Sequence, residues 1–264
     1  MRSPGQAFDL RAALSEELRG AIEELETVHS DPKSVHRCRV RVKRARALAR
    51  IGNACAPGLS SVFVDSARSL MRNLALARDP AALSEAALSA GSQSGKRTAH
   101  AFTTVANSID ETAASHPSLN LEAARAGLKD LLALAQVWPE ASHRQIKRGA
   151  KRLDRRARRA RRRGLSSLDP VRRHQWRMRE KDRLLAATIL DEAWPGKRRR
   201  KTSEKVCEAL GGERDALLLM ERLVAEPELA GDERDLRRAL KTLNRLRGKL
   251  ARRANTLAAR LRSK

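Results

Sequence analysis

Apolar residues recur at spacings of three and four positions over nearly the whole chain, and this periodicity constrains the fold most strongly. Near the start the apolar stripe consists of Leu10, Leu14, Leu18, Ile22, Leu25 and Val28. In the last segment it consists of Leu236, Leu240, Leu243, Leu250, Leu257 and Leu261. Such spacing places apolar side chains on one face of a helix. No run alternates as a strand does, so the sequence predicts an all-α protein with roughly eight further helices between these two.

Proline and glycine indicate where the helices end, because they terminate helices or occupy their first turn. Breaks are expected at Asp31-Pro32, Pro57-Gly58, Asp79-Pro80, Gly91 to Gly95, His116-Pro117, Trp138-Pro139, Gly164 to Pro170, Pro195-Gly196, Gly211-Gly212, Pro227 and Gly231. The 264 residues are enough to bury a core, and only 2% of them are aromatic. A core rich in alanine and leucine favours closely packed helices.

The chain is strongly basic, with 56 Lys and Arg against 31 Asp and Glu and a formal net charge of +25. Such a field attracts polyanions, which here means nucleic acid, an anionic membrane surface or polyphosphate. The charge is uneven, since the first helix is acidic while the segment from Arg144 to Arg163 is basic apart from Asp154. This asymmetry indicates a directed basic surface.

A short pattern, H-x-x-R-x-R-x-K, occurs at His36 to Lys43 and again at His174 to Lys181. Further on, the pair Arg78-Asp79 matches Arg214-Asp215 at nearly the same offset, which is about half the chain. The duplication predicts one domain, residues 1–264, with related helical halves at residues 1–116 and 117–264. We interpret the two Arg-Asp pairs mainly as structural, because an Asp after a break can cap a helix, although the Arg can still face a basic site.

Positions i, i+3 and i+7 share one face of a helix, so the basic residues form three stripes. The first stripe comprises His36, Arg39, Lys43, Arg46 and Arg50. The second comprises His174, Arg177 and Lys181. The third comprises Arg148, Arg152, Arg155, Arg159 and Arg162. Stacked like charges destabilise an isolated helix, and a bound polyanion relieves that cost. A basic run alone is commonly a solvated face, but repetition of the pattern favours a binding site.

The three residue types suit phosphate. Guanidinium offers a planar fork to phosphate oxygens, Lys offers a point charge, and His adds a donor whose charge responds near neutral pH. The first stripe carries no acid in its sequence, whereas Glu180 and Asp182 flank Lys181. We therefore expect the first stripe to bind more tightly than the second.

The ordered set of motifs resembles the CHAD domain, the conserved histidine α-helical domain. That family carries a His-x-x-Arg-x-x-x-Lys/Arg helix in each of two halves, and the second often has Trp before the Arg. An arginine-rich helix precedes the second motif, and an L-G-x-x-R/H-D element follows it. The matching residues here are His36, Arg39, Lys43, His174, Trp176, Arg177, Lys181, Leu210, Gly211, Arg214 and Asp215. The resemblance extends from about Phe8 to Leu261.

The resemblance implies two helical bundles related by a pseudo-twofold axis, with a central basic channel that binds inorganic polyphosphate without chemistry. An association with polyphosphate granules is also expected. The chain departs from the family after Lys181, where Leu184 and Leu185 stand in place of the usual aromatic. Many members are fused to a CYTH triphosphatase domain, but its Glu-x-Glu-x-Lys signature does not occur in this sequence. No hydrolase activity is therefore expected.

The alternative function is sequence-independent nucleic-acid binding, because both ligands are held by phosphate neutralisation and counterion release. Proteins that bind single strands usually stack bases on aromatic side chains, and this chain has three Phe, three Trp and no Tyr. No helix-turn-helix, zinc-finger or RNA-recognition signature occurs. Polyphosphate is therefore the favoured partner, with weaker nucleic-acid binding as the second expectation.

Enzymatic, metal-dependent and membrane functions fit the sequence less well. There is no G-x-x-x-x-G-K-S/T loop, and the six His lie apart without metal-ligand spacing. We expect no catalysis, cofactor or metal. No stretch approaches the ~20 apolar residues of a transmembrane helix, and Met1 to Leu10 lacks an apolar signal-peptide core. No helix carries Trp or Phe opposite its Arg stripe, so membrane binding is not expected. Cys38, Cys55 and Cys207 are expected to be reduced thiols of a cytoplasmic protein.

Overall fold

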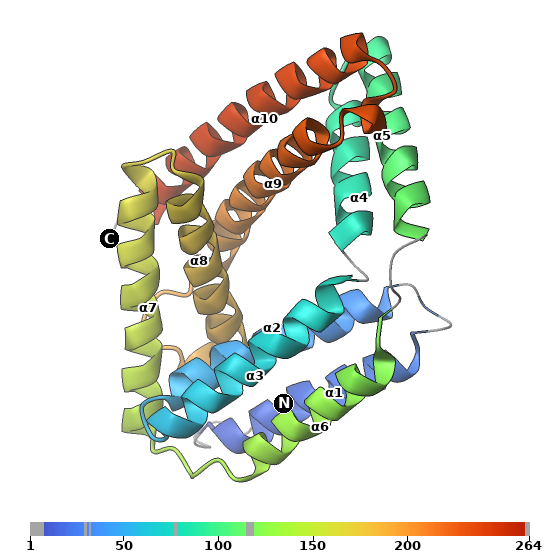
Figure 1. Ribbon diagram of the computed structural model, residues 1–264. Helices are drawn as coiled ribbons and strands as arrows, with labels where there is room; N and C mark the ends of the chain where they lie inside the picture. Colours follow the sequence, from blue (N-terminus) through green and yellow to red (C-terminus); the bar gives the residue numbers. More distant parts are fainter. Residues whose placement is uncertain (1–7, 29–30, 32, 77–78, 115–118, 262–264) are drawn as a thin grey trace. The chain divides into compact units, whose positions relative to one another are not determined.

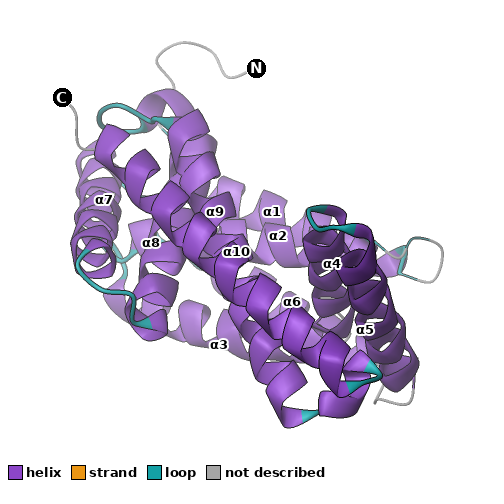
Figure 2. Ribbon diagram, turned by 90° about the horizontal axis from the view of Figure 1, so that it is seen from above, coloured by secondary structure: helices purple, strands orange, loops and turns teal. Residues whose placement is uncertain are grey.

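The computed structural model describes residues 8–28, 31, 33–76, 79–114 and 119–261. Within these ranges all regular secondary structure is helical, and no strand is present (Figures 1 and 2). The prediction of an all-α protein is confirmed. Cys38, Cys55 and Cys207 form no disulfide bond within the described residues.

The described residues form ten α-helices and two short 3-10 helices. Their bounds are α1 Leu10–Glu26, α2 Ser34–Gly52, α3 Pro57–Leu76, α4 Asp79–Ser92, α5 Lys96–Ala114, α6 Leu121–Gln136, α7 His143–Leu165, α8 Pro170–Leu190, η1 Asp191–Ala193, α9 Arg200–Ala225, η2 Pro227–Ala230 and α10 Glu233–Arg260. Eight α-helices thus lie between the two amphipathic segments first identified, as expected. Predicted breaks fall between helices or in their first or last turn, with one exception, while Pro32, His116 and Pro117 lie outside the described residues.

Several helices begin with side-chain caps of the type that the sequence favours. The carboxylate of Asp9 accepts a hydrogen bond from the backbone N–H of Ala12 at 2.9 Å. Asn120 caps α6 in the same way, and Asp232 caps α10. Each cap satisfies an N–H group that the first turn of the helix leaves without a backbone partner.

The predicted break at Gly211-Gly212 is wrong, because both glycines lie inside the continuous helix α9. A Cβ on Gly212 would lie 3.0 Å from a methyl group of Leu250, and one on Gly211 would lie 3.5 Å from the guanidinium of Arg177. The two glycines therefore allow neighbouring side chains to approach α9 closely. Asp215 also lies within this helix and cannot cap it, so the capping role expected for Asp215 is wrong.

The chain forms two compact units. The first consists of Met1–Ala75, Leu119–Arg162 and Met178–Arg200, and the second of Leu76–Ser118, Arg163–Arg177 and Lys201–Lys264. Each unit takes segments from both predicted halves of the sequence, so the units are distinct from those halves. The division into related halves at residues 1–116 and 117–264 stays a prediction.

The core of the first unit contains an aromatic pair and two close backbone approaches. The rings of Phe63 and Trp138 meet edge to face, with their centroids 5.8 Å apart. A Cβ on Gly52 would lie 2.5 Å from the Trp138 ring. A Cβ on Gly149, in α7, would collide with the carbonyl group of Ile51, coming within 2.9 Å of its carbon. Helix α7 can therefore contact the backbone at the end of α2 only because residue 149 is glycine.

The second unit buries a separate apolar core between α4, α5, α9, α10 and η2. The largest buried side chains that pack there are Phe102, Val105, Ile109, Leu219, Leu223, Leu229 and Leu243. Gly231 ends η2 with a φ of +81°, a left-handed conformation that glycine adopts without the strain of a Cβ.

We predict that Gly149→Ala destabilises the protein, because the added methyl group meets a backbone carbonyl that cannot move aside independently. The free energy of unfolding should fall by about 1–3 kcal/mol, although alanine has a higher helix propensity than glycine. The matched control is Gly127→Ala in α6, where the nearest atom to a new Cβ is a Leu70 methyl group at 3.5 Å. Thermal unfolding followed by circular dichroism measures both variants. A Gly149→Ala protein as stable as the control would contradict the close approach.

Candidate functional site

Helix α2 carries basic residues on two faces, and the acidic helix α1 neutralises one of them. Arg37 pairs with Glu24 at 2.5 Å and with Asp31 at 2.6 Å. Arg41 and Arg44 both lie within 4 Å of Glu17. The acids of α1 therefore neutralise one basic face of α2. The first stripe is the other basic face of this helix.

The first stripe runs from solvent into the interior of the first unit. His36 is exposed, and Arg39 and Lys43 are half-buried. Arg46 and Arg50 are buried, with only 7% and 8% of their surface accessible to solvent. The sequence placed all five residues on one face of a helix, and the structure shows that this face becomes buried toward its end.

A carboxylate from α8 meets the buried end of this stripe. Nη1 of Arg50 donates a hydrogen bond to Oδ1 of Asp182 at 3.2 Å, and Nη1 of Arg179 lies 3.6 Å from Oδ2. Burial lowers the pKa of Arg50 to about 10, although Asp182 acts in the opposite direction, and nearby Arg46, Arg179 and Arg68 lower it further. Burial is likewise the largest cause of the lowered pKa of Arg46. The stripe therefore ends in a crowded cluster of cations around one acid.

The second stripe was expected to be weaker because Glu180 and Asp182 flank Lys181 in the sequence, and the structure corrects this reason. Glu180 and Asp182 are both buried, with 1% and 3% of their exposure left, whereas Lys181 between them is exposed. Glu180 pairs with Arg183 at 2.9 Å. Asp182 thus neutralises part of the first stripe, which was expected to have no acid, and neither acid shares the exposed face of Lys181.

The third stripe lies on α7 and is exposed throughout. Two hollows of about 300 Å³ each open along this helix. One is lined by Arg152, Arg155, Arg156 and Arg159. The other is lined by Asn53, Ala54, Arg148, Gly149, Arg152 and Arg155. Arg162 is exposed beyond both hollows. The side chain of Arg152 donates a hydrogen bond to Asn53, so the residues that follow α2 help to orient the arginines of α7.

Arg156 connects the surface of α7 with the buried cluster. It lines the first hollow, and burial, Arg179 and Arg152 lower its pKa, in that order. We call Arg46, Arg50, Arg156 and Arg179 the arginine cluster, of which Arg50 and Arg179 lie within 4 Å of Asp182. All of it belongs to the first unit.

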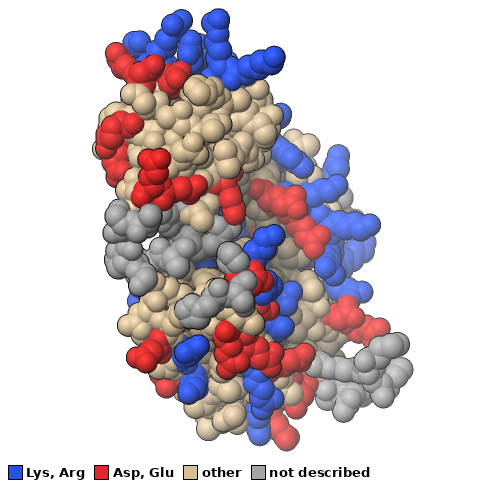
Figure 3. All heavy atoms as spheres, turned by 90° about the vertical axis from the view of Figure 1, so that its right-hand side faces the viewer, with Lys and Arg blue, Asp and Glu red and all other residues tan. Residues whose placement is uncertain are grey.

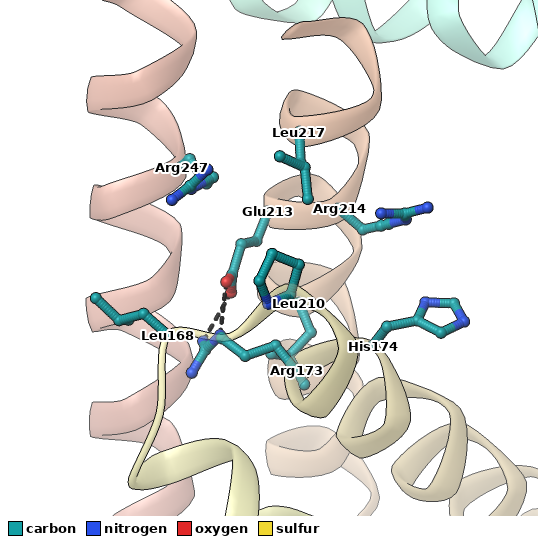
Figure 4. Close-up of a pocket in the computed structure, with 9 residues that line it drawn as sticks. Leu168, Arg173, His174, Leu210, Glu213, Arg214, Leu217 and Arg247 are labelled. Carbon is teal, nitrogen blue, oxygen red and sulfur yellow. Dashed lines mark hydrogen bonds and ion pairs between the residues drawn. The ribbon is translucent and has the colours of Figure 1, made fainter. Parts of the chain in front are cut away.

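The second unit holds the start of the second stripe beside a small pocket (Figure 4). Arg173 forms a two-pronged pair with Glu213, with contacts of 2.5 Å and 2.7 Å. It also donates hydrogen bonds to Asn255 and to the carbonyl of Gly164. This buried network fixes the beginning of α8 against α9 and α10. His174 and Arg214 both extend from the same side of the pocket, away from the Arg173–Glu213 pair.

The charge of His174 depends on its neighbours. Partial shielding from water, followed by the charges of Arg214 and Arg177, lowers the pKa of His174 below its usual value. The ring is therefore mostly neutral at neutral pH in the ligand-free protein. A phosphate group beside it would favour the protonated form.

Three residues of these sites were not among the predicted binding residues: Arg156, Arg179 and Arg214. Arg179 is the second arginine of the repeated pattern, but its counterpart Arg41 pairs with acids of α1, so the repeat alone does not separate their roles. Arg214 belongs to the repeated Arg-Asp pair. Nothing in the basic run of α7 distinguishes Arg156 from its neighbours.

The described part of the chain shows neither a metal site nor a membrane span. No group of three or more His, Cys, Asp or Glu in it could hold a metal ion. None of its helices has the length and apolar character needed to cross a bilayer. On the face in Figure 3, acidic and basic side chains lie among each other, so the large net charge is not a uniform coat of cations.

Comparison with solved structures identifies the fold. A crystal structure of the CHAD domain from the plant Ricinus communis matches with a TM-score of 0.56 and 18% sequence identity, covering 98% of this chain and 94% of that one. No curated protein sequence gives a match. The sequence model of the CHAD domain matches residues 12–223, which is most of the chain. The resemblance noted in the motifs is thereby confirmed, and the chain belongs to the CHAD domain family.

Proposed function

We propose that this protein binds inorganic polyphosphate without altering it. The observation that carries the proposal is the row of exposed arginines on α7, which lines two open hollows. From Arg148 to Arg162 the row extends roughly 21 Å at about 1.5 Å per residue. Asp154 on the same helix pairs with Arg158, which lies outside the row. A regular line of guanidinium groups suits a linear chain of phosphates.

The aromatic residues favour polyphosphate over nucleic acid as the ligand. The three Trp and three Phe of the chain are all buried, with relative exposures of at most 7%. Single-stranded nucleic acids are commonly held by bases stacked on exposed aromatic rings. A ligand that consists of phosphate alone needs no such surface. Duplex DNA, which is held mainly through its phosphates, remains the second candidate.

Competition separates the two ligands. Labelled long-chain polyphosphate is titrated with the protein at several salt concentrations, and single-stranded and duplex DNA are added as competitors. We expect polyphosphate to bind more tightly than either DNA at physiological salt. Tighter binding of DNA would overturn the proposal. Incubation of polyphosphate with the protein and a divalent metal tests for chemistry, since shortened chains would reveal an enzyme.

Further expectations drawn from the sequence stay predictions. They are a central basic channel shared by the pseudo-twofold-related halves, a cytoplasmic location and association with polyphosphate granules. Fluorescence microscopy of the tagged protein beside stained granules tests the last two.

We predict that Arg152→Ala combined with Arg155→Ala weakens polyphosphate binding and reduces its salt dependence. Removal of two phosphate contacts should make the slope of log affinity against log salt shallower by roughly one and a half units. Arg234→Ala combined with Arg237→Ala on α10 removes the same charge from exposed positions elsewhere. Equal effects in both variants would mean that the ligand responds to net charge and not to the α7 row. Circular dichroism confirms that each variant is folded.

We predict that polyphosphate binds more tightly as the pH falls from about 8 to about 6. His174 has a lowered pKa in the free protein, and bound phosphate raises it, so binding takes up a proton. Each unit of difference between the two pKa values adds about tenfold to the affinity below both of them. His174→Gln should flatten this dependence, whereas His100→Gln, a change at an exposed position in α5, should not. An unchanged pH profile in His174→Gln would exclude His174 as a contact.

A further inference from the structure

Asp182 is an acid buried within the arginine cluster, where it lies between cations from α2 and from its own helix. It retains 3% of its exposure. Its Oδ1 accepts from Arg50 of α2 at 3.2 Å, and its Oδ2 accepts no hydrogen bond from the described residues, although Arg179 lies 3.6 Å away. The carboxylate therefore occupies a position where oxygen atoms meet guanidinium groups from two helices.

The cluster holds more positive than negative charge. Arg46 and Arg50 are more than nine-tenths buried, and Arg179 is half-buried beside them. Glu180, the neighbouring buried acid, pairs with Arg183. Nε of Arg46 is buried and donates no hydrogen bond within the described part of the chain. Buried cations are costly unless they are paired and hydrogen-bonded, so one carboxylate leaves this group under-neutralised.

The cluster is also connected to the surface that carries the proposed function. Arg156 lines the hollow on α7, and after burial the charge of Arg179 contributes to its lowered pKa. Arg179 itself lies 3.6 Å from Asp182 and keeps 38% of its side chain exposed, so a phosphate would reach the cluster through Arg179.

We propose that the arginine cluster is a subsite for one phosphate group of the chain and that Asp182 limits its affinity as a resident carboxylate. This inference rests on the proposed function. The carboxylate neutralises part of the cluster in the ligand-free protein, which allows the arginines to be buried. It also repels an incoming phosphate, so the subsite is weaker than its number of arginines would suggest. Asp182 therefore lowers the affinity of the subsite for phosphate through its charge and makes no favourable contact with the ligand.

The first test is Asp182→Asn, which keeps the shape of the side chain and removes its charge. We expect tripolyphosphate and long-chain polyphosphate to bind about tenfold more tightly, because a like charge no longer opposes them. Asp154→Asn is the matched control, since it removes one acid from α7 outside the cluster. A folded Asp182→Asn protein whose affinity is unchanged, reduced or increased only as much as in the control would overturn the inference.

The second test does not depend on the folding of the first variant. Arg46→Met replaces a crowded cation by an apolar side chain of similar length, and buried charges replaced in this way often leave stability unchanged or improved. We expect the melting temperature to stay the same or rise while the affinity for tripolyphosphate falls about tenfold. A lower melting temperature with unchanged affinity would show that Arg46 is structural and would overturn the subsite.

The two proposals fail in different ways. If neither the wild-type protein nor Asp182→Asn binds polyphosphate, the proposed function is wrong. If the wild-type protein binds and both variants bind as it does, the function stands and the subsite is wrong.

Discussion

The close approach of Gly149 to the carbonyl group of Ile51 brings α7, which carries the exposed arginine row, against the end of α2. Because α7 approaches the backbone of α2 at this point, Arg152 reaches Asn53 just beyond the end of α2. The same contact places the exposed row of α7 near the point where the first stripe becomes buried. A side chain at position 149 would separate the two helices and widen the distance between their cations.

Arginines that are buried near one another need acids close by to neutralise them. In this chain a different acid pairs with the arginines on each helix face. Glu17 and Glu24 of α1 neutralise the side of α2 that carries Arg37, Arg41 and Arg44. On the other side Asp182 is the acid that meets Arg50. In the second unit Glu213 holds Arg173 in a buried pair that positions the start of α8. Most basic residues of α7 face solvent, where their charge is available to a ligand, whereas Arg161 is partly buried.

The helices were predictable because each carries its own periodic stripe and its own terminators, and these are local features of sequence. The break at Gly211-Gly212 failed for a physical reason: glycine ends helices, but it also permits close packing, and only the neighbours Leu250 and Arg177 distinguish the two cases. The stripes were likewise predictable as helix faces. The burial of Arg46 and Arg50 was not, since it depends on helices distant in sequence. The pairing of Arg50 with Asp182 joins residues separated by 132 positions, and no local pattern contains it.

The interleaving of the two units has a consequence for synthesis of the chain. Every segment of the first unit has been made once Arg200 is reached, whereas the second unit still lacks α9 and α10 at that point. Phe102 and Ile109 of α5 share one apolar core with Leu219 and Leu243 of those later helices. A domain that emerges early can fold while the remainder is still being translated, but the apolar face of α5 must wait for more than a hundred residues before its partners exist. During that interval we expect the apolar face of α5 to stay exposed.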